Sequence, residues 1–233
     1  MSMTVLKGKG VFGGISFGKI KIYKRNDHEI KRYKVEDVDA EIKRYEDAKK
    51  IAIVQLESLR EKALKEVGES NSMIFDIHKM MLEDADYCDS IINIIKTQSV
   101  NAEYAVSVTC DNFSNMFLSM DDAYMNARSS DVKDVSKRLI KVLMDSLENI
   151  VSFDGPSIVA ADDLTPSETV QMDKNKVLGF VTMGGSSTSH TAILARTMDI
   201  PAVIGVGDQL KDSFDEQFAV IDGFSGYVYI DPD

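Results

Sequence analysis

The chain has 233 residues, of which 38 are acidic and 27 basic, so its formal charge at pH 7 is −11. The length allows one or two domains with cores of their own, and no run approaches the roughly 18 apolar residues of a membrane span. Clusters of Lys and Arg that would neutralise nucleic-acid phosphates are lacking and two cysteines are too few for a disulfide framework, so we expect a cytoplasmic protein that neither inserts into a membrane nor binds nucleic acid.

The first predicted elements are strands near the amino terminus. The segment from Val5 to Tyr23 carries a strand pattern, and within it Phe17–Tyr23 alternates at period two. This segment is too short to form a domain by itself. We therefore expect it to join a sheet formed by residues later in the chain.

The middle of the chain predicts helices. Of 14 glycines and four prolines, only Gly68 lies between Tyr23 and Ile150. Apolar residues recur there at three- and four-residue steps, which is typical of amphipathic helices, and Gly68 predicts the end of the first one. Because the connections are short, the helices bury their apolar faces against one another in a bundle. The predicted helices cover Val38 to Gly68, Ser72 to Leu82, Asp86 to Gln98, Ala102 to Met120 and Asp131 to Leu147.

One helical segment is unusually acidic. Residues Glu66–Ser90 contain seven acidic side chains and one basic one, interleaved with more Met, Ile and Phe than a single buried helix face needs. Adaptable methionines beside carboxylates are typical of a surface that docks onto a basic protein with an apolar centre. A core stripe beside a solvated acidic face is the alternative, and the residues alone leave both open.

The end of the chain predicts a small α/β domain. Its β-branched runs are bounded by Gly, Pro or Asp, and the helical pattern from Thr191 to Met198 lies between two of them. Together with the amino-terminal strands, this region forms a domain of residues 1–22 plus 151–233, into which residues 23–150 are inserted as a helical subdomain. The predicted strands are Ile158–Ala161, Val177–Thr182, Ala202–Val206, Ala219–Asp222 and Tyr227–Ile230.

The three histidines are His28, His78 and His190, and His190 has the most informative surroundings. His28 lies in a charged stretch and is expected in a solvated loop. His190 follows the Gly/Ser/Thr-rich segment 184–189 and directly precedes the predicted helix Thr191–Met198. The first N–H groups of a helix have no intrahelical partner and carry partial positive charge, so they favour an anion and disfavour an imidazolium.

A neutral imidazole in this position is a candidate nucleophile. A phosphoryl group attached to His190 would have its oxygens held by Thr188, Ser189, Thr191 and the backbone amides, and the loop lacks carboxylates that would repel it. A serine hydrolase would need G-x-S-x-G, a P-loop would need Gly-Lys-Ser/Thr and a metal site would need ligand spacing. The loop offers none of these, but an N-capping Ser189 beside an incidental histidine stays open.

Several motifs in order resemble one known family, over most of the chain. They are similar to the amino-terminal domain of enzyme I, the phosphoenolpyruvate-protein phosphotransferase of the bacterial sugar phosphotransferase system. The motifs are Leu164–Thr169, Val177–Thr182, Thr188–Arg196 and Ile200–Gly205.

The resemblance implies an α/β phosphohistidine domain of the swivelling type with an inserted all-α helical bundle. It implies that His190 takes a phosphoryl group from phosphoenolpyruvate on Nε2 and passes it to a histidine of the phosphocarrier HPr. Thr169 matches a threonine that hydrogen-bonds the active histidine, and a helix or turn residue after Pro166 is the alternative reading. The HPr-docking residues implied by the resemblance are Asp76, His78, Met81, Glu83, Asp84, Asp86, Tyr87 and Arg128.

The resemblance also implies limits. The family loop Gly-Gly-Arg-Thr-Ser-His is altered here, because Ser186 and Ser187 replace the second Gly and the Arg. A paralogue that has altered activity, or that only binds an HPr-type partner, is therefore an alternative. The swivelling domain of a dikinase-type enzyme is a further alternative, against which the helical insertion and the acidic segment speak. In the family, phosphoenolpyruvate and Mg²⁺ bind to a following carboxyl-terminal domain. We expect no metal or cofactor in this chain and only the partial reaction from it.

Overall fold

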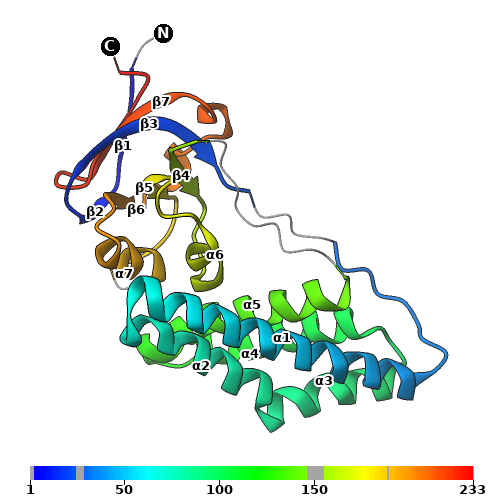
Figure 1. Ribbon diagram of the computed structural model, residues 1–233. Helices are drawn as coiled ribbons and strands as arrows, with labels where there is room; N and C mark the ends of the chain where they lie inside the picture. Colours follow the sequence, from blue (N-terminus) through cyan, green and yellow to red (C-terminus); the bar gives the residue numbers. More distant parts are fainter. Residues whose placement is uncertain (1–2, 25–28, 146–154, 188, 233) are drawn as a thin grey trace. The chain divides into compact units, whose positions relative to one another are not determined.

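The computed structural model describes residues 3–24, 29–145, 155–187 and 189–232. The chain forms two compact units, one of residues 1–26 with 149–233 and one of residues 27–148, here called the α/β unit and the helical unit. In Figure 1 the α/β unit combines the blue amino-terminal strands with the yellow-to-red carboxyl-terminal elements. The boundaries predicted after residues 22 and 150 stay predictions, because the chain crosses between the units through segments outside the described residues.

The α/β unit contains one eight-stranded mixed sheet, in the order β1-β8-β7-β3-β4-β5-β6-β2. The amino-terminal strands therefore join the carboxyl-terminal ones, as predicted. β3, β4, β5 and β6 are mutually parallel neighbours, whereas the other pairings are antiparallel. The strands are β1 (Thr4–Lys7), β2 (Lys9–Phe12), β3 (Ile15–Ile22), β4 (Ser157–Ala161), β5 (Val177–Thr182), β6 (Ala202–Ile204), β7 (Phe218–Asp222) and β8 (Tyr227–Ile230).

The sheet curls back on itself. β1 and β2 lie at opposite ends of the strand order, yet only Gly8 separates them in the chain. Gly8 N donates to Gly226 O at 2.9 Å, and a Cβ atom on Gly8 would lie 2.5 Å from Ile204 O. Only glycine allows this close approach of backbones.

Two apolar cores fix the curled sheet. Its inner face is filled by side chains from seven strands, among them Ile20, Val181 and Ile221. The outer face of β4, β5 and β6 packs against two short helices, α6 (Pro166–Gln171) and α7 (His190–Thr197), with Phe180 and Ala195 in that core. Two 3₁₀ turns, Gly207–Gln209 and Asp212–Phe214, connect β6 to β7.

The helical unit contains five helices within the described residues, shown from light blue to green in Figure 1. The first ends at Gly68, whose φ of +82° suits glycine, as predicted. The last begins at Ala123, eight residues before the predicted start, and it ends at Leu143. The helices are α1 (Val38–Val67), α2 (Glu69–Glu83), α3 (Ala85–Gln98), α4 (Ala102–Leu118) and α5 (Ala123–Leu143).

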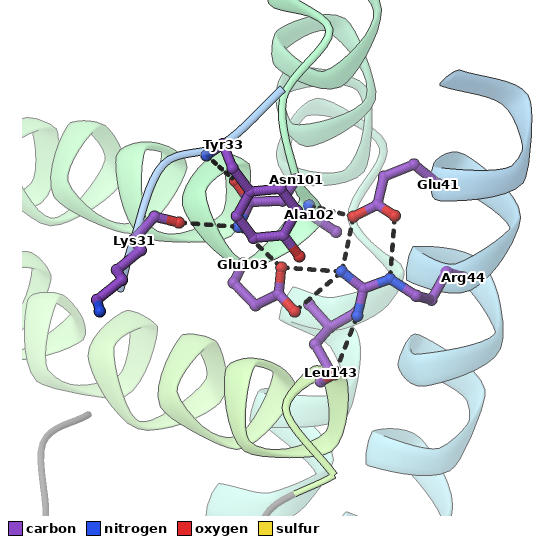
Figure 2. Close-up of polar contacts among 8 residues, drawn as sticks. All are labelled: Lys31, Tyr33, Glu41, Arg44, Asn101, Ala102, Glu103 and Leu143. Atoms are coloured by element: carbon purple, nitrogen blue, oxygen red, sulfur yellow. Dashed lines mark hydrogen bonds and ion pairs between the residues drawn. The ribbon is translucent and has the colours of Figure 1, made fainter. Parts of the chain in front are cut away.

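A polar network centred on Arg44 joins three of these helices (Figure 2). The Arg44 guanidinium donates from Nε and Nη2 to Glu41 at 3.0 and 2.6 Å, and from Nη2 to Glu103 at 2.8 Å. Its Nη1 donates to Leu143 O at 2.9 Å, which caps the end of α5. Glu41 also accepts from Ala102 N at 2.6 Å. Two largely buried carboxylates thus share one cation.

The same network holds the segment that precedes α1. Asn101 accepts from Tyr33 N at 3.0 Å and donates to Lys31 O at 3.1 Å, while its Nδ2 also donates to Glu103 at 2.9 Å. The backbone bond from Val35 N to Ser99 O extends this pairing. The segment that leads into α1 is therefore held by Asn101, the residue before α4, and by the Ser99 carbonyl.

Candidate functional site

The His190 segment lies at the carboxyl ends of the parallel strands β4, β5 and β6. Gly184 N donates to Asp162 O at 2.8 Å, and Gly205 N donates to Gly184 O at 3.1 Å. The buried Thr182 hydroxyl donates to the same Gly184 carbonyl at 2.7 Å. The loop after β5 is thus tied to the loops after both neighbouring strands. This edge is where open α/β sheets place ligands.

A short capped turn leads from this loop into α7. Ser189 has extended backbone angles, donates through its N–H to Ser186 O at 2.9 Å and accepts from Ala192 N at 3.4 Å. Gly185 has a φ of +103°, which favours glycine. His190 is the first residue of the helix and is partly buried. Ser189 therefore caps the helix, as the alternative explanation of this segment expects, and the helix begins at His190, one residue before the predicted Thr191.

Thr191 has a different role from the predicted one. Its side chain is fully buried, and its hydroxyl donates to Leu164 O at 3.3 Å and to Asp163 Oδ1 at 3.4 Å. The hydroxyl anchors α7 to the connection between β4 and α6, so the prediction that it supports a phosphoryl group is wrong for the side chain. The backbone N–H of Thr191 still belongs to the first turn of the helix.

The structure leaves the predicted roles of three other residues, Thr169, Thr188 and His28, untested. Thr169 is 1 % exposed, and its hydroxyl donates within α6 to Thr165 O at 2.9 Å and Pro166 O at 3.0 Å. Its predicted hydrogen bond to His190 stays a prediction. Thr188 and His28 lie outside the described residues.

Asp163 is a residue of this region that the sequence did not single out. The loop itself carries no carboxylate, but the fold brings Asp163 to Thr191 from 28 positions earlier in the chain. The pair Asp162-Asp163 directly after a predicted strand was the available signal, since carboxyl ends of parallel strands meet at one edge.

The helical unit carries a groove of about 480 Å³ between α2, α3, α4 and α5. Met80 and Tyr124 on its rim are 68 % and 65 % exposed. We call it the docking groove. Five of the eight predicted docking residues line it, namely Met81, Asp84, Asp86, Tyr87 and Arg128. Its other lining residues are Ile77, Met80, Phe113, Met116, Phe117, Tyr124, Met125, Val132 and Val135.

Arg128 is held rigidly at the groove. Its Nη1 donates to Asp131 Oδ2 at 2.8 Å, its Nη2 donates to the Tyr124 hydroxyl, and its Cζ lies 4.4 Å from the Tyr124 ring centroid. Burial lowers the pKa of Arg128, but the hydrogen bonds with Tyr124 and Asp131 outweigh it and raise that pKa above its ordinary value. Arg128 is therefore a fixed cation in the lining of the groove.

Tyr87 contributes its ring to the groove and its hydroxyl to the core. The side chain is 4 % exposed, and its oxygen lies 2.7 Å from Ser136 Oγ. Burial raises the pKa of Tyr87. Asp84 caps α3 by accepting from Tyr87 N at 2.9 Å, so one acidic groove residue also positions the helix start.

The other three predicted docking residues lie elsewhere in the helical unit. Glu83 is exposed at the end of α2, and Asp76 accepts from Arg60 Nε at 2.8 Å. His78 is 0 % exposed and faces Asp131 and Asp134 of α5, so the prediction that it is a surface contact is wrong. It occupies the inward face of α2, where polar partners replace the usual apolar ones.

Within the described ranges, the side chains form no metal cluster and the helices include no membrane span. No group of three or more His, Cys, Asp or Glu side chains there is arranged to hold a metal ion. None of the helices there combines the length and the apolar character needed to cross a bilayer.

The chain is similar to known proteins over almost its whole length. Residues 7–128 match the family described as PEP-utilising enzyme, N-terminal, and residues 153–226 match the PEP-utilising enzyme, mobile domain. Proteins called phosphoenolpyruvate-protein phosphotransferase are 40 % identical over 97 % of this chain in Listeria monocytogenes and 37 % identical over 99 % of it in Bacillus subtilis. The chain spans about 40 % of the length of these relatives.

Two solved structures share the fold. A solution NMR structure of Enzyme I (nEIt) is 36 % identical, with a TM-score of 0.76 over 98 % of this chain and 93 % of that one. A structure described as the N-terminal domain of Enzyme 1 - Nitrogen is 20 % identical, with a TM-score of 0.65 over 98 % of this chain and 94 % of that one. The first likeness joins sequence and fold, and the second concerns the fold alone.

Proposed function

The chain belongs to the family of PEP-utilising enzymes, whose N-terminal model covers more than half of it, and we propose that it performs the phosphoryl relay of a phosphoenolpyruvate-protein phosphotransferase. In this proposal His190 carries the phosphoryl group between phosphoenolpyruvate, bound by a further part of the full-length enzyme together with Mg²⁺, and a histidine of HPr. We place the reaction in the cytoplasm, which suits two cysteines that are both free thiols.

The relay consists of two displacements at phosphorus. In the first, Nε2 of neutral His190 attacks the phosphoryl group of phosphoenolpyruvate, a P–N bond forms, and the P–O bond to enolpyruvate breaks. In the second, a ring nitrogen of the HPr histidine attacks the same phosphorus, and the P–N bond to His190 breaks with its electron pair returning to Nε2. The phosphoryl group is conserved through both steps.

The position of His190 at the start of α7 is the observation that carries the proposal. There the helix dipole favours the neutral ring over the imidazolium and favours the anionic phosphoryl adduct. The first N–H groups of α7 and the Ser189 hydroxyl are the donors available to the phosphoryl oxygens. The backbone bonds that tie the loop to its neighbours keep these donors preorganised.

The docking groove is the proposed binding surface for HPr. Its apolar floor of Met, Phe and Tyr side chains, with Asp84 and Asp86 at one side, suits a basic partner with an apolar centre. Glu83, which precedes Asp84 in the chain, is exposed and adds to the acidic field that would speed encounter.

Labelling with phosphorylated HPr tests the relay. HPr carrying a ³²P-phosphoryl group on its histidine should label the wild-type chain, and unlabelled HPr should reverse the labelling. His190→Ala should abolish labelling, whereas His28→Ala, a matched histidine control, should retain it. The proposal would be overturned if the His190→Ala variant were labelled, or if the wild-type chain were not labelled.

A second candidate function rests on the altered loop. Arg forks suit phosphate oxygens, and Ser186 and Ser187 stand where the family has Gly and Arg. A chain with an inert loop would be a partner-binding module that docks HPr through the groove. Titration calorimetry showing HPr binding, combined with no phosphoryl exchange, would favour this function. The isolated chain should turn over no phosphoenolpyruvate under either proposal.

A further inference from the structure

His78 belongs to a buried cluster beneath the docking groove. Its ring is fully buried, with Nε2 3.5 Å from Asp131 Oδ1 and Nδ1 3.8 Å from Asp134 Oδ2. Asp131 and Asp134 are themselves only 2 % and 7 % exposed. A carboxylate accepts hydrogen bonds and does not donate them, so an imidazole N–H that faces one attracts it, most strongly where water is excluded. A phenyl ring, that of Phe75, meets the imidazole edge-on at 6.0 Å.

Asp131 links this cluster to the groove wall. Its other oxygen, Oδ2, accepts from Nη1 of Arg128 at 2.8 Å, and the Arg128 side chain is 15 % exposed. The guanidinium lies over the ring of Tyr124, and both side chains line the groove. Ile77, the neighbour of His78 on α2, also lines it. A continuous series of contacts therefore runs from the buried imidazole to the exposed rim.

We propose that His78 is a positioning residue for the docking groove, acting through Asp131 to fix the guanidinium of Arg128. The role in partner binding rests on the proposed function, whereas the effect on Arg128 is a property of the free chain. A histidine that only fills the core would need neither ring nitrogen, because Phe or Leu fills space equally well. Two nitrogens facing two carboxylates, one of which holds Arg128, point instead to orientation of that cation.

The first test concerns the free chain. Exchange of the Arg128 Nη hydrogens with water, followed by NMR, should be about tenfold faster in His78→Phe than in the wild type, because Asp131 loses the imidazole that faces its Oδ1 and then holds the guanidinium less firmly. His78→Gln keeps an N–H donor at similar reach and should restore slow exchange. If His78→Phe does not show the far-UV circular dichroism of the wild type, the smaller His78→Leu takes its place. Equal exchange in the wild type and the apolar variant would overturn the proposal.

The second test is a double-mutant cycle on HPr affinity. Arg128→Ala and His78→Phe should each weaken binding by about tenfold, and the double variant should bind no worse than Arg128→Ala alone. Multiplicative losses would mean that His78 acts independently of Arg128 and would overturn the proposal. If wild-type HPr binding is absent, the proposed function fails, and the exchange measurement alone decides the role of His78.

Discussion

Removing the Arg44 cation from its network should destabilise the helical unit strongly. Arg44→Met keeps the length of the aliphatic stem but leaves Glu41 and Glu103, each with a side chain 11 % exposed, without their shared partner. Breaking a buried pair from one side costs about 3–5 kcal/mol. Because the Arg44 side chain is 36 % exposed, we take the low end, about 3 kcal/mol at pH 7.

Urea titration followed by far-UV circular dichroism measures this loss. Nearly all helical signal comes from α1 to α5, so the ellipticity reports the helical unit even if the two units unfold separately. With a slope of about 1–3 kcal/mol per M, the midpoint should fall by about 1–3 M. The matched control is Lys43→Met on the same helix, whose exposed pair with Asp47 is worth about 0.5 kcal/mol or less.

The pH dependence gives the reasoning a second check. In the wild type, burial raises the pKa of Glu41, but the hydrogen bonds from Arg44 and Ala102 and the Arg44 charge together lower it below its ordinary value. Glu41 therefore contributes stability that is present above its unfolded pKa and is lost as the pH falls through the lower folded pKa. In Arg44→Met burial dominates and raises the pKa of Glu41 in the folded state, so the variant gains stability as the pH falls. The difference in unfolding free energy between the variant and the wild type should therefore narrow from pH 7 to pH 5. A midpoint within 0.5 M of the wild type at pH 7 would refute the network's role.

Three further substitutions test the local contacts. Thr191→Val should lower the thermal stability of the α/β unit by about 1–2 kcal/mol and slow phosphoryl exchange, because the anchor of α7 is lost; unchanged melting contradicts this. Gly8→Val should lower the stability of the α/β unit by about 1–3 kcal/mol in thermal melting, because the new Cβ would meet Ile204 O. Unchanged stability would mean that the backbone at residue 8 can move away from β6. Tyr87→Phe should cost about 1 kcal/mol in urea yet leave HPr affinity unchanged, whereas tenfold weaker binding would mean that the hydroxyl contacts the partner.

Most of the secondary structure could be predicted because each element carries its own periodicity. β3 alternates, α1 repeats at three and four residues, and Gly68 stops it with a positive φ. α5 was predicted to start too late because its first turns present polar side chains inward. Ser129 and Asp131 are 7 % and 2 % exposed there, so no apolar period marks the buried face.

The same cause explains the error at His78. A histidine in an acidic, methionine-rich segment suggests a surface, but its partners lie on α5, more than 50 positions away, where Asp131 and Asp134 are also buried. The spacing of apolar residues cannot reveal a buried helix face whose residues are polar. His190 was easier to interpret because its cap, loop and helix are contiguous in the chain. The contact of Thr191 with Leu164 depends on parallel strand pairing and has no local signature.

The His190 segment and the docking groove are each held by contacts within their own compact unit. Variants at the two places should therefore have separable effects on the kinetics of phosphoryl transfer. The loop before His190 is fixed by bonds to Asp162 and Gly205 within the α/β unit, whereas Arg128 is fixed by contacts within α5 of the helical unit. In phosphoryl transfer between the chain and HPr, Arg128→Ala should therefore raise the KM for HPr by about tenfold and leave kcat unchanged. Ser187→Arg, which adds a guanidinium beside the proposed phosphoryl site, should change kcat with little effect on KM. If both variants changed the two constants together, docking and transfer would not be separable.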